Sequence, residues 1–290
     1  MWLYDIDRSD DTDPTLARMP PWKATALVIA GAIVAIPCLL APGLFLGGTS
    51  EAPLVAPALG FGLAIVSFPL LAHLAGVPPG VLFIRLPTHN TGRWVLVGVG
   101  LVGTVVVTVG LLGSGSYVVR VDLPGHVLFA LSVGLLVGLW TGTVEEILLR
   151  GYLLSVVGHR WHWPGAVALS AILFGLLHHG AATDLMGKLA YMVVTTLAGA
   201  FFGLVTIRTG NVWNAVALHG TWNAAFHPSV IRLEDVCDAA DALLGYAPPP
   251  DHVLLGGSVT APTESPIVAV LFGIAGVVAL HHWYGPGSDS

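Results

Sequence analysis

The chain has 290 residues, of which 55% are hydrophobic and only 10% are charged. Its mean hydropathy of +0.82 lies outside the range of soluble globular domains, so the composition excludes a soluble enzyme and predicts a polytopic membrane protein. The formal net charge of -6 comes from 11 basic and 17 acidic residues, which leaves no basic surface for nucleic acid. The two cysteines, Cys38 and Cys237, form neither a disulfide framework nor a metal-binding spacing.

Eight apolar runs approach the roughly 20 residues that a membrane-spanning helix needs. We therefore expect an all-α fold, a polytopic transmembrane bundle of about eight helices. The start of the chain is polar and acidic, unlike the basic start of a cleaved signal peptide. Residues 1–23 are thus expected to form a cytoplasmic tail, and residues 24–290 a single membrane domain. The runs occupy residues 24–46, 55–76, 93–113, 125–157, 163–180, 188–207, 211–227 and 266–283.

Basic residues in the loops predict the orientation, because they are enriched on the cytoplasmic side. Arg8, Arg18, Lys23, Arg85, Arg93, Arg150, Arg160 and Arg208 fall on one side of the runs, and Arg120, Lys188 and Arg232 on the other. We expect an integral protein of a prokaryotic plasma membrane with both termini in the cytoplasm. The connection 228–265 then lies outside, and its part 232–246 is expected to form a short surface helix.

Two adjacent carboxylates, Glu145 and Glu146, lie with Arg150 inside the fourth run. Ionisable groups are costly in a membrane unless they face the protein interior or a wet cavity, so these three mark a candidate site. On a helix Glu146 and Arg150 are four residues apart and can pair, whereas Glu145 is rotated by about 100°. We therefore assign Glu146 and Arg150 a structural role and leave Glu145 for chemistry. The face of the pair also carries three small residues that predict close helix packing: Gly134, Gly138 and Gly142.

Three further polar residues, His178, His219 and Asn223, occur in later runs. His219 and Asn223 are four residues apart and share a helical face, and Phe174 and His178 repeat this spacing. Counting about 1.5 Å per residue from the cytoplasmic helix ends, we expect these groups and Glu145 to line one cavity nearer the cytoplasmic half.

Such a set of groups suits peptide hydrolysis without a covalent intermediate. A carboxylate and an imidazole that share one water can activate it as general base, and a second imidazole with an amide can stabilise an oxyanion. Glu145, His178 and His219 could instead bind zinc, and spacing alone does not separate the two. We expect no cofactor, with zinc as the alternative, because asparagine suits a hydrogen-bond donor better than a zinc ligand.

Three motifs in order resemble those of the CAAX protease and bacteriocin-processing intramembrane endopeptidases. They are the Glu-Glu-x-x-x-Arg of residues 145–150, the Phe-x-x-x-His of residues 174–178 and the His-x-x-x-Asn of residues 219–223. The resemblance covers about residues 125–227 and includes the type II CAAX prenyl endopeptidases. It implies a glutamate-dependent protease in which Glu145 and His178 activate water, His219 and Asn223 form the oxyanion site, Glu146 and Arg150 hold the site together, and Phe174 packs beside it.

The resemblance implies a peptide or protein substrate, which is lipidated in CAAX-type C-terminal processing, and membrane lipid as surroundings. A non-catalytic scaffold or bacteriocin-immunity-like protein with the same fold is the alternative. The intact set of Glu145, His178, His219 and Asn223 argues against it, because a scaffold does not need all four. A proton-coupled transporter is a further option, but the sequence shows no repeat of broken helices.

Overall fold

The computed structural model describes residues 14–46, 52–112, 116–121, 123–179, 185–233, 242–247 and 266–284. Each of the eight apolar runs contains a helix, which confirms the helical bundle. The helices are α1 (Thr15–Arg18), α2 (Pro21–Leu46), α3 (Ala52–Leu74), η1 (Pro79–Leu82), α4 (Thr91–Leu112), α5 (Pro124–Glu146), η2 (Ile147–Leu153), α6 (Leu154–Arg160), α7 (Trp163–Leu177), α8 (Leu185–Thr209), α9 (Val212–Ala225) and α10 (Pro266–Tyr284).

Six helices in the described part of the chain are long and apolar enough to cross a membrane, if the continuous stretch α5–η2–α6 counts as one. The other two, α7 and α9, have 15 and 14 residues. At 1.5 Å per residue such helices are shorter than the hydrocarbon core of a bilayer. The apolar runs 163–180 and 211–227 overestimated them, since α7 ends at Leu177 before His178, and α9 ends at Ala225 before Phe226 and His227.

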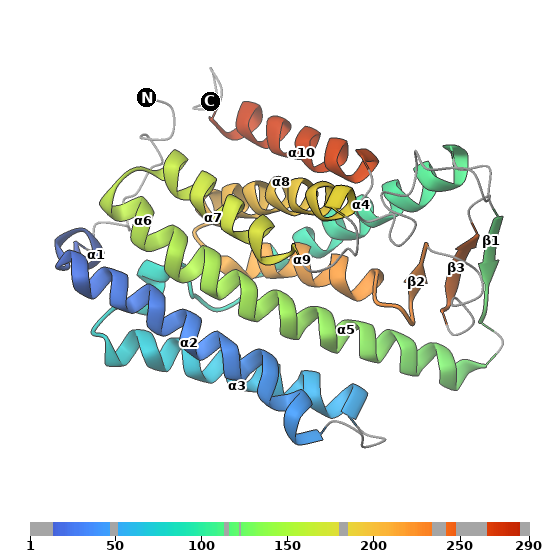
Figure 1. Ribbon diagram of the computed structural model, residues 1–290, viewed down its shortest axis with the longest axis horizontal. Helices are drawn as coiled ribbons and strands as arrows, with labels where there is room; N and C mark the ends of the chain where they lie inside the picture. Colours follow the sequence, from blue (N-terminus) through green and yellow to red (C-terminus); the bar gives the residue numbers. More distant parts are fainter. Residues whose placement is uncertain are drawn as a thin grey trace.

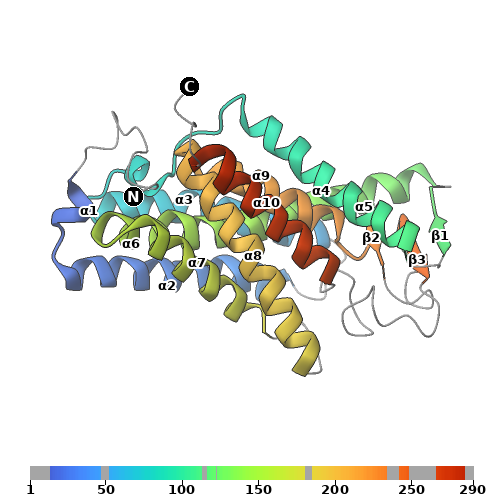
Figure 2. The same cartoon turned by 90° about the horizontal axis from the view of Figure 1, so that it is seen from above.

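Helix α9 lies inside the bundle and packs against α4, α5 and α8. The long stretch α5–η2–α6 crosses the whole molecule, with α2 and α3 on one side of it and α8 and α10 on the other (Figure 1). Seen from above, α7 lies beside α8, and α10 runs along α8 on its outer side (Figure 2). The described chain begins and ends at the same end of the bundle (Figure 1). We call this end the α1 end.

A small sheet, which the sequence did not predict, lies at the opposite end of the bundle (Figure 1). It consists of β1 (Ser116–Val119), β2 (Ile231–Arg232) and β3 (Leu244–Ala247) in the order β1-β3-β2. Strand β3 pairs antiparallel with β1 and parallel with β2. The surface helix expected over residues 232–246 is therefore wrong at both of its ends, and its middle, residues 234–241, lies outside the described residues. Strands this short carry no recognisable alternation of polar and apolar residues.

Glycines allow α5 and α9 to touch along their backbones, as their spacing predicts. A Cβ on Gly138 would lie 2.3 Å from the carbonyl oxygen of Gly220, and one on Gly134 would lie 2.7 Å from that of Ala224. Gly142 faces the backbone nitrogen of Gly220 at 3.2 Å. Close approach through small residues is how membrane helices gain packing without a hydrophobic driving force.

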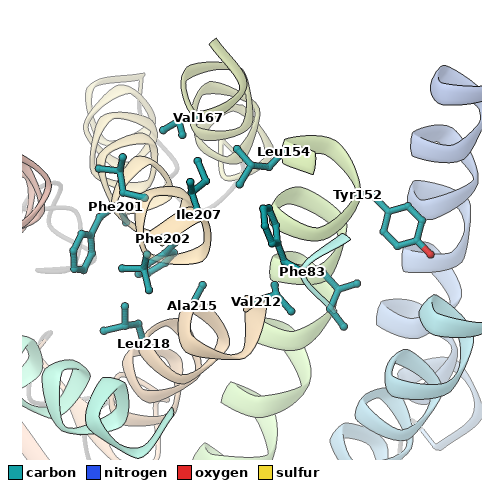
Figure 3. Packing of buried hydrophobic residues seen from close by; sticks show 14 of the residues in the cluster. Phe83, Tyr152, Leu154, Val167, Phe201, Phe202, Ile207, Val212, Ala215 and Leu218 are labelled. Carbon is teal, nitrogen blue, oxygen red and sulfur yellow. The ribbon is translucent and has the colours of Figure 1, made fainter. Parts of the chain in front are cut away.

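Apolar side chains fill the space between α7, α8 and α9. Phe202 of α8 lies toward Ala215 and Leu218 of α9, and Ile207 of α8 lies toward Val167 of α7 and Leu154 (Figure 3). The outer faces of α2 and α4 instead carry exposed apolar side chains, as surfaces in contact with lipid do. Examples are Ile33 and Ile36 on α2 and Leu96 and Val99 on α4.

We predict that Gly138→Ala separates α5 from α9, because its methyl group would overlap backbone atoms that cannot move independently. Overpacking of this kind costs about 1–3 kcal/mol. The matched control is Gly103→Ala on α4, where a Cβ would meet no atom within 4 Å. Thermal melting in detergent should show a lower Tm for Gly138→Ala and an unchanged or higher Tm for Gly103→Ala. Equal Tm values would contradict the packing role.

Candidate active site

Only two of the described residues have acidic side chains, Glu145 and Glu146. Both lie in the last turn of α5, directly before the π-helical segment η2. A π-helical segment interrupts the regular i→i−4 hydrogen bonds and often marks a functional site. The carbonyl of Leu149 in this segment accepts from the backbone N–H of Leu154 and also from the Ser170 hydroxyl of α7, the latter at 3.0 Å.

A buried chain of charged groups joins three helices behind the site. Arg150 and Glu146 are both fully buried, and Nη1 of Arg150 donates to Oε1 of Glu146 at 2.9 Å. The same oxygen lies 2.9 Å from Nδ1 of His219 on α9. Nη2 of Arg150 donates to the carbonyl of Gly199 on α8 at 3.0 Å. The predicted pair is thus confirmed and extends to a third residue, His219.

Aromatic rings enclose this buried chain. The guanidinium carbon of Arg150 lies 4.5 Å from the ring centre of Phe174 and 5.7 Å from that of Phe202, distances at which a cation is attracted to a ring. Phe202 also stacks on the imidazole of His219, with ring centres 5.3 Å apart. A Cβ on Gly199 would lie 2.9 Å from Nη2 of Arg150. Glycine therefore leaves the room that the guanidinium occupies.

Glu145 faces away from this chain, toward two imidazoles. Its Oε2 atom lies 3.7 Å from Nε2 of His178 and 3.9 Å from Nε2 of His219. Oε2 is buried and accepts no hydrogen bond from the described residues, although the side chains of Glu145 and His178 are 25% and 22% exposed. Distances of this size are too long for direct hydrogen bonds and suit groups that share one water.

Hydrogen bonds at the Nδ1 atoms assign the tautomers of both histidines. Nδ1 of His178 lies 2.7 Å from the carbonyl oxygen of Phe174, so it carries the proton and leaves Nε2 as an acceptor toward Glu145. The sequence suggested that His178 lies inside a spanning helix. In the structure it is the residue at which α7 ends. Nδ1 of His219 likewise donates to Glu146.

Asn223 is held between His219 and Thr141. Its amide nitrogen lies 3.1 Å from Nε2 of His219 and donates to the Thr141 hydroxyl at 3.0 Å. Thr141 in turn donates to the carbonyl of Val137 at 2.9 Å. Both amide hydrogens are thus engaged within the protein, and Nε2 of His219 acts as an acceptor in this arrangement.

A cavity of about 360 Å³ begins at Glu145 and extends between α5 and α9 to strand β2. It leads toward the sheet end of the bundle, opposite the α1 end. The sequence predicted a site nearer the cytoplasmic half of the membrane. That prediction did not include the direction in which the cavity leads. The lining residues are Val137, Thr141, Glu145, Tyr191, Trp222, Asn223, Phe226, His227, Pro228, Ile231, Arg232 and Leu233.

Within the described residues, no group of three or more His, Cys, Asp or Glu side chains is arranged to hold a metal ion. Of the nitrogens that zinc would need, Nε2 of His219 already accepts a hydrogen bond from Asn223. A metal at that atom would displace the amide.

Sequence reasoning missed two residues of the site. Thr141 precedes Glu145 by four residues on the same helix, so its position in an apolar run was a usable signal. Phe202 carries no such signal, because an aromatic residue in a membrane helix is ordinary.

The fold and the site define an integral membrane protein of helical type in which two adjacent carboxylates lie with two imidazoles and an amide. Of these groups, Glu145 and Asn223 line the cavity. Residues 127–225 match the family described as type II CAAX prenyl endopeptidase, Rce1-like. The match supports the resemblance of this part of the chain to the CAAX protease and bacteriocin-processing family. The match covers α5 to α9 and leaves α2, α3, α4, the sheet and α10 outside it. No curated protein and no solved structure matches the chain.

We predict that Glu146→Ala destabilises the protein far more than the matched variant Glu145→Ala. Removing Glu146 leaves the fully buried Arg150 without its carboxylate and His219 without its acceptor. Breaking a buried ion pair in this way costs about 3–5 kcal/mol. Glu145 has no such partner, so its replacement should change the Tm little. Equal Tm values for the two variants, measured in the same detergent, would contradict the separate roles.

Proposed function

We propose that the protein is an intramembrane endopeptidase that hydrolyses a peptide bond with a water molecule activated by Glu145 and His178. The observation that carries this proposal is the position of Oε2 of Glu145, within 4 Å of two imidazole nitrogens, on a residue that lines a cavity. The match to the Rce1-like family supports an endopeptidase of the CAAX type in general.

The geometry fits a water that donates one hydrogen to Glu145 and the other to Nε2 of His178. Both atoms are acceptors, and their separation of 3.7 Å leaves room for a bridging oxygen beside them. Glu145 takes the proton as the water attacks the peptide carbonyl, and then delivers it to the leaving amine. The carbonyl of Phe174 fixes the ring of His178 during these steps.

Asn223 is the donor for the oxyanion that forms on the peptide carbonyl. One of its amide hydrogens points at Thr141, a hydroxyl that lines the same cavity. A substrate oxygen that takes the place of Thr141 as acceptor would receive this hydrogen without displacing Asn223 from His219. His219 then acts as a positioning residue, held by Glu146 and stacked on Phe202.

The cavity would accommodate an extended peptide along α5 and α9, with Trp222 and Phe226 as apolar walls and Arg232 of β2 in the lining. The guanidinium of Arg232 suits the terminal carboxylate of a peptide that ends close to the cleaved bond. Exposed apolar surfaces on the surrounding helices would admit a lipid chain attached to the substrate. CAAX-type processing of a lipidated C-terminus is the specific reaction that we propose, without a metal cofactor.

Loop charges determine from which side the substrate would enter. Basic residues gather at the α1 end, which the positive-inside tendency places in the cytoplasm of a prokaryotic plasma membrane, together with both termini. Because the cavity leads to the sheet end, the substrate would then arrive from the outer side. This reverses the expectation of cleavage near the cytoplasmic face.

A non-catalytic scaffold or immunity-like protein remains the second candidate. The observation that favours an enzyme instead is the buried Oε2 of Glu145, which accepts no hydrogen bond from the described residues and lies beside two imidazoles. Glu146 differs in that its Oε1 is held by Arg150 and His219, as expected of a carboxylate retained for structure, although its Oε2 also accepts no hydrogen bond from the described part of the chain.

We predict that Glu145→Gln and His178→Ala lower the cleavage of a farnesylated reporter peptide by about 10²–10⁴-fold, the usual contribution of a general base. The matched control is His179→Ala, an exposed imidazole next to His178. Turnover is measured with purified protein in detergent, and thermal melting verifies that each variant is folded. Undiminished turnover in either active-site variant refutes the assigned roles.

The same assay separates the zinc alternative. Metal content is measured on the purified protein, and turnover is measured again after treatment with a chelator. Unchanged turnover supports water activation by Glu145 and His178 alone. Stoichiometric zinc whose removal stops turnover would make His178, His219 and Glu145 metal ligands.

We predict that Val119→Cys is labelled by a membrane-impermeant maleimide in intact cells, whereas Leu86→Cys is labelled only after the cells are opened. Val119 is exposed at the sheet end and Leu86 at the α1 end. Both variants carry Cys237→Ser, and Cys38 is buried. The opposite labelling pattern would place the cavity on the cytoplasmic side and remove the argument for an outer substrate.

A further inference from the structure

A second cavity, of about 540 Å³, lies at the α1 end, among residues separate from those that line the active site. Three chain segments build it: the connection from η1 to α4, the first turns of α4, and the turn from α8 to α9. We call it the basic cavity. Its lining consists of Arg85, Leu86, Thr88, Asn90, Arg93, Trp94, Val97, Arg208, Thr209, Gly210, Asn211 and Asn214.

The lining carries three arginines and no acidic residue. Each arginine comes from a different segment: Arg85 follows η1, Arg93 lies in the first turn of α4 and Arg208 near the end of α8. The acidic residues of the described chain, Glu145 and Glu146, belong to the active site. Positive charge is therefore concentrated here. The beginnings of α4 and α9 add the positive ends of two helix dipoles.

Buried hydrogen bonds hold the three segments in place. The Asn211 side chain is 4% exposed, and it donates to the carbonyl of Leu86 at 2.9 Å and accepts from the backbone of Trp213. Asn214 is 2% exposed and accepts from the Thr91 hydroxyl at 2.9 Å. Between α8 and α9, Gly210 adopts a φ of 60°, which a residue with a side chain rarely does. The basic cavity is thus a built feature rather than a chance group of surface arginines.

The surroundings of the basic cavity place it at the level of lipid headgroups. Trp94 of its lining packs against Trp283 near the end of α10, with ring centres 5.8 Å apart, and tryptophans gather at the membrane interface. Leu86 of the lining is an exposed apolar side chain. Leu96 and Val99, one to two turns further along α4, are exposed as well. An apolar path therefore runs from the basic cavity along the outer face of α4.

We propose that the basic cavity binds the phosphate group of an anionic glycerophospholipid, with the acyl chains along α4. Guanidinium groups recognise phosphate oxygens through paired hydrogen bonds. The apolar path favours a lipid over free phosphate, because only a lipid has acyl chains that can contact it. This site is independent of the proposed hydrolysis, since none of its residues lines the cavity at Glu145.

The test is retention of lipid by the purified full-length protein. The protein is incubated with equal amounts of phosphatidylglycerol and phosphatidylcholine that carry the same acyl chains, and bound lipid is counted by native mass spectrometry. Wild type should retain one phosphatidylglycerol in preference. The double variant Arg93→Gln/Arg208→Gln should lose roughly 25-fold in affinity, which is about 2 kcal/mol for two basic groups at 1.4 kcal/mol per tenfold change.

The matched control is Arg18→Gln/Lys23→Gln, which removes two exposed charges at the same end outside the basic cavity. Its retention should equal that of wild type. Equal losses in the two double variants, or equal retention of phosphatidylcholine, would overturn the proposal. Displacement of phosphatidylglycerol by inorganic phosphate at similar concentration would also overturn it, in favour of a site for the free ion. Each outcome is independent of peptide cleavage.

Discussion

The burial of one guanidinium constrains the whole active site. Arg150 is fully buried, and an isolated charge in such a place would cost several kcal/mol. Its environment compensates from three directions: the carboxylate of Glu146, the carbonyl of Gly199 and the rings of Phe174 and Phe202. These groups belong to α5, α7 and α8, so the charge fixes the relative positions of the helices. Since Glu146 also holds His219, the imidazole beside Glu145 is oriented through the same contact.

Two adjacent carboxylates take different roles because a helix turns by about 100° per residue. Glu146 points toward the bundle interior and meets a cation, while Glu145 points into the cavity and meets two imidazoles. The glycines of α5 contribute on the interior side. They bring α9 close enough for His219 to reach Glu146, since a Cβ on Gly142 would lie only 3.2 Å from the backbone of Gly220. The face of α5 that carries Glu146 and the glycines therefore both packs against α9 and orients His219.

Much of this arrangement was predictable from spacing alone. Positions four residues apart predicted the pairing of Glu146 with Arg150, and apolar runs predicted the helical bundle. Spacing could not show that His219 bonds to Glu146, because that contact joins residues 73 positions apart. Nor could it show the π-helical segment after Glu146, in which the carbonyl of Leu149 also accepts from Ser170 of α7. The sheet was not predicted for a related reason: strands of two to four residues form only when tertiary contacts bring them together.

The short length of α9 shapes the cavity, because the lining continues past the end of this helix at Ala225 to Leu233. A helix that crosses the whole membrane fills its place in the bundle with side chains. Helix α7 instead ends at His178, and α9 ends two residues after Asn223, so each brings a polar residue to its end inside the molecule. Beyond the end of α9, backbone that is not helical must line a wet space or be buried in protein. The cavity therefore follows from where α9 stops, and Glu145 is the only one of the two described carboxylates in its lining.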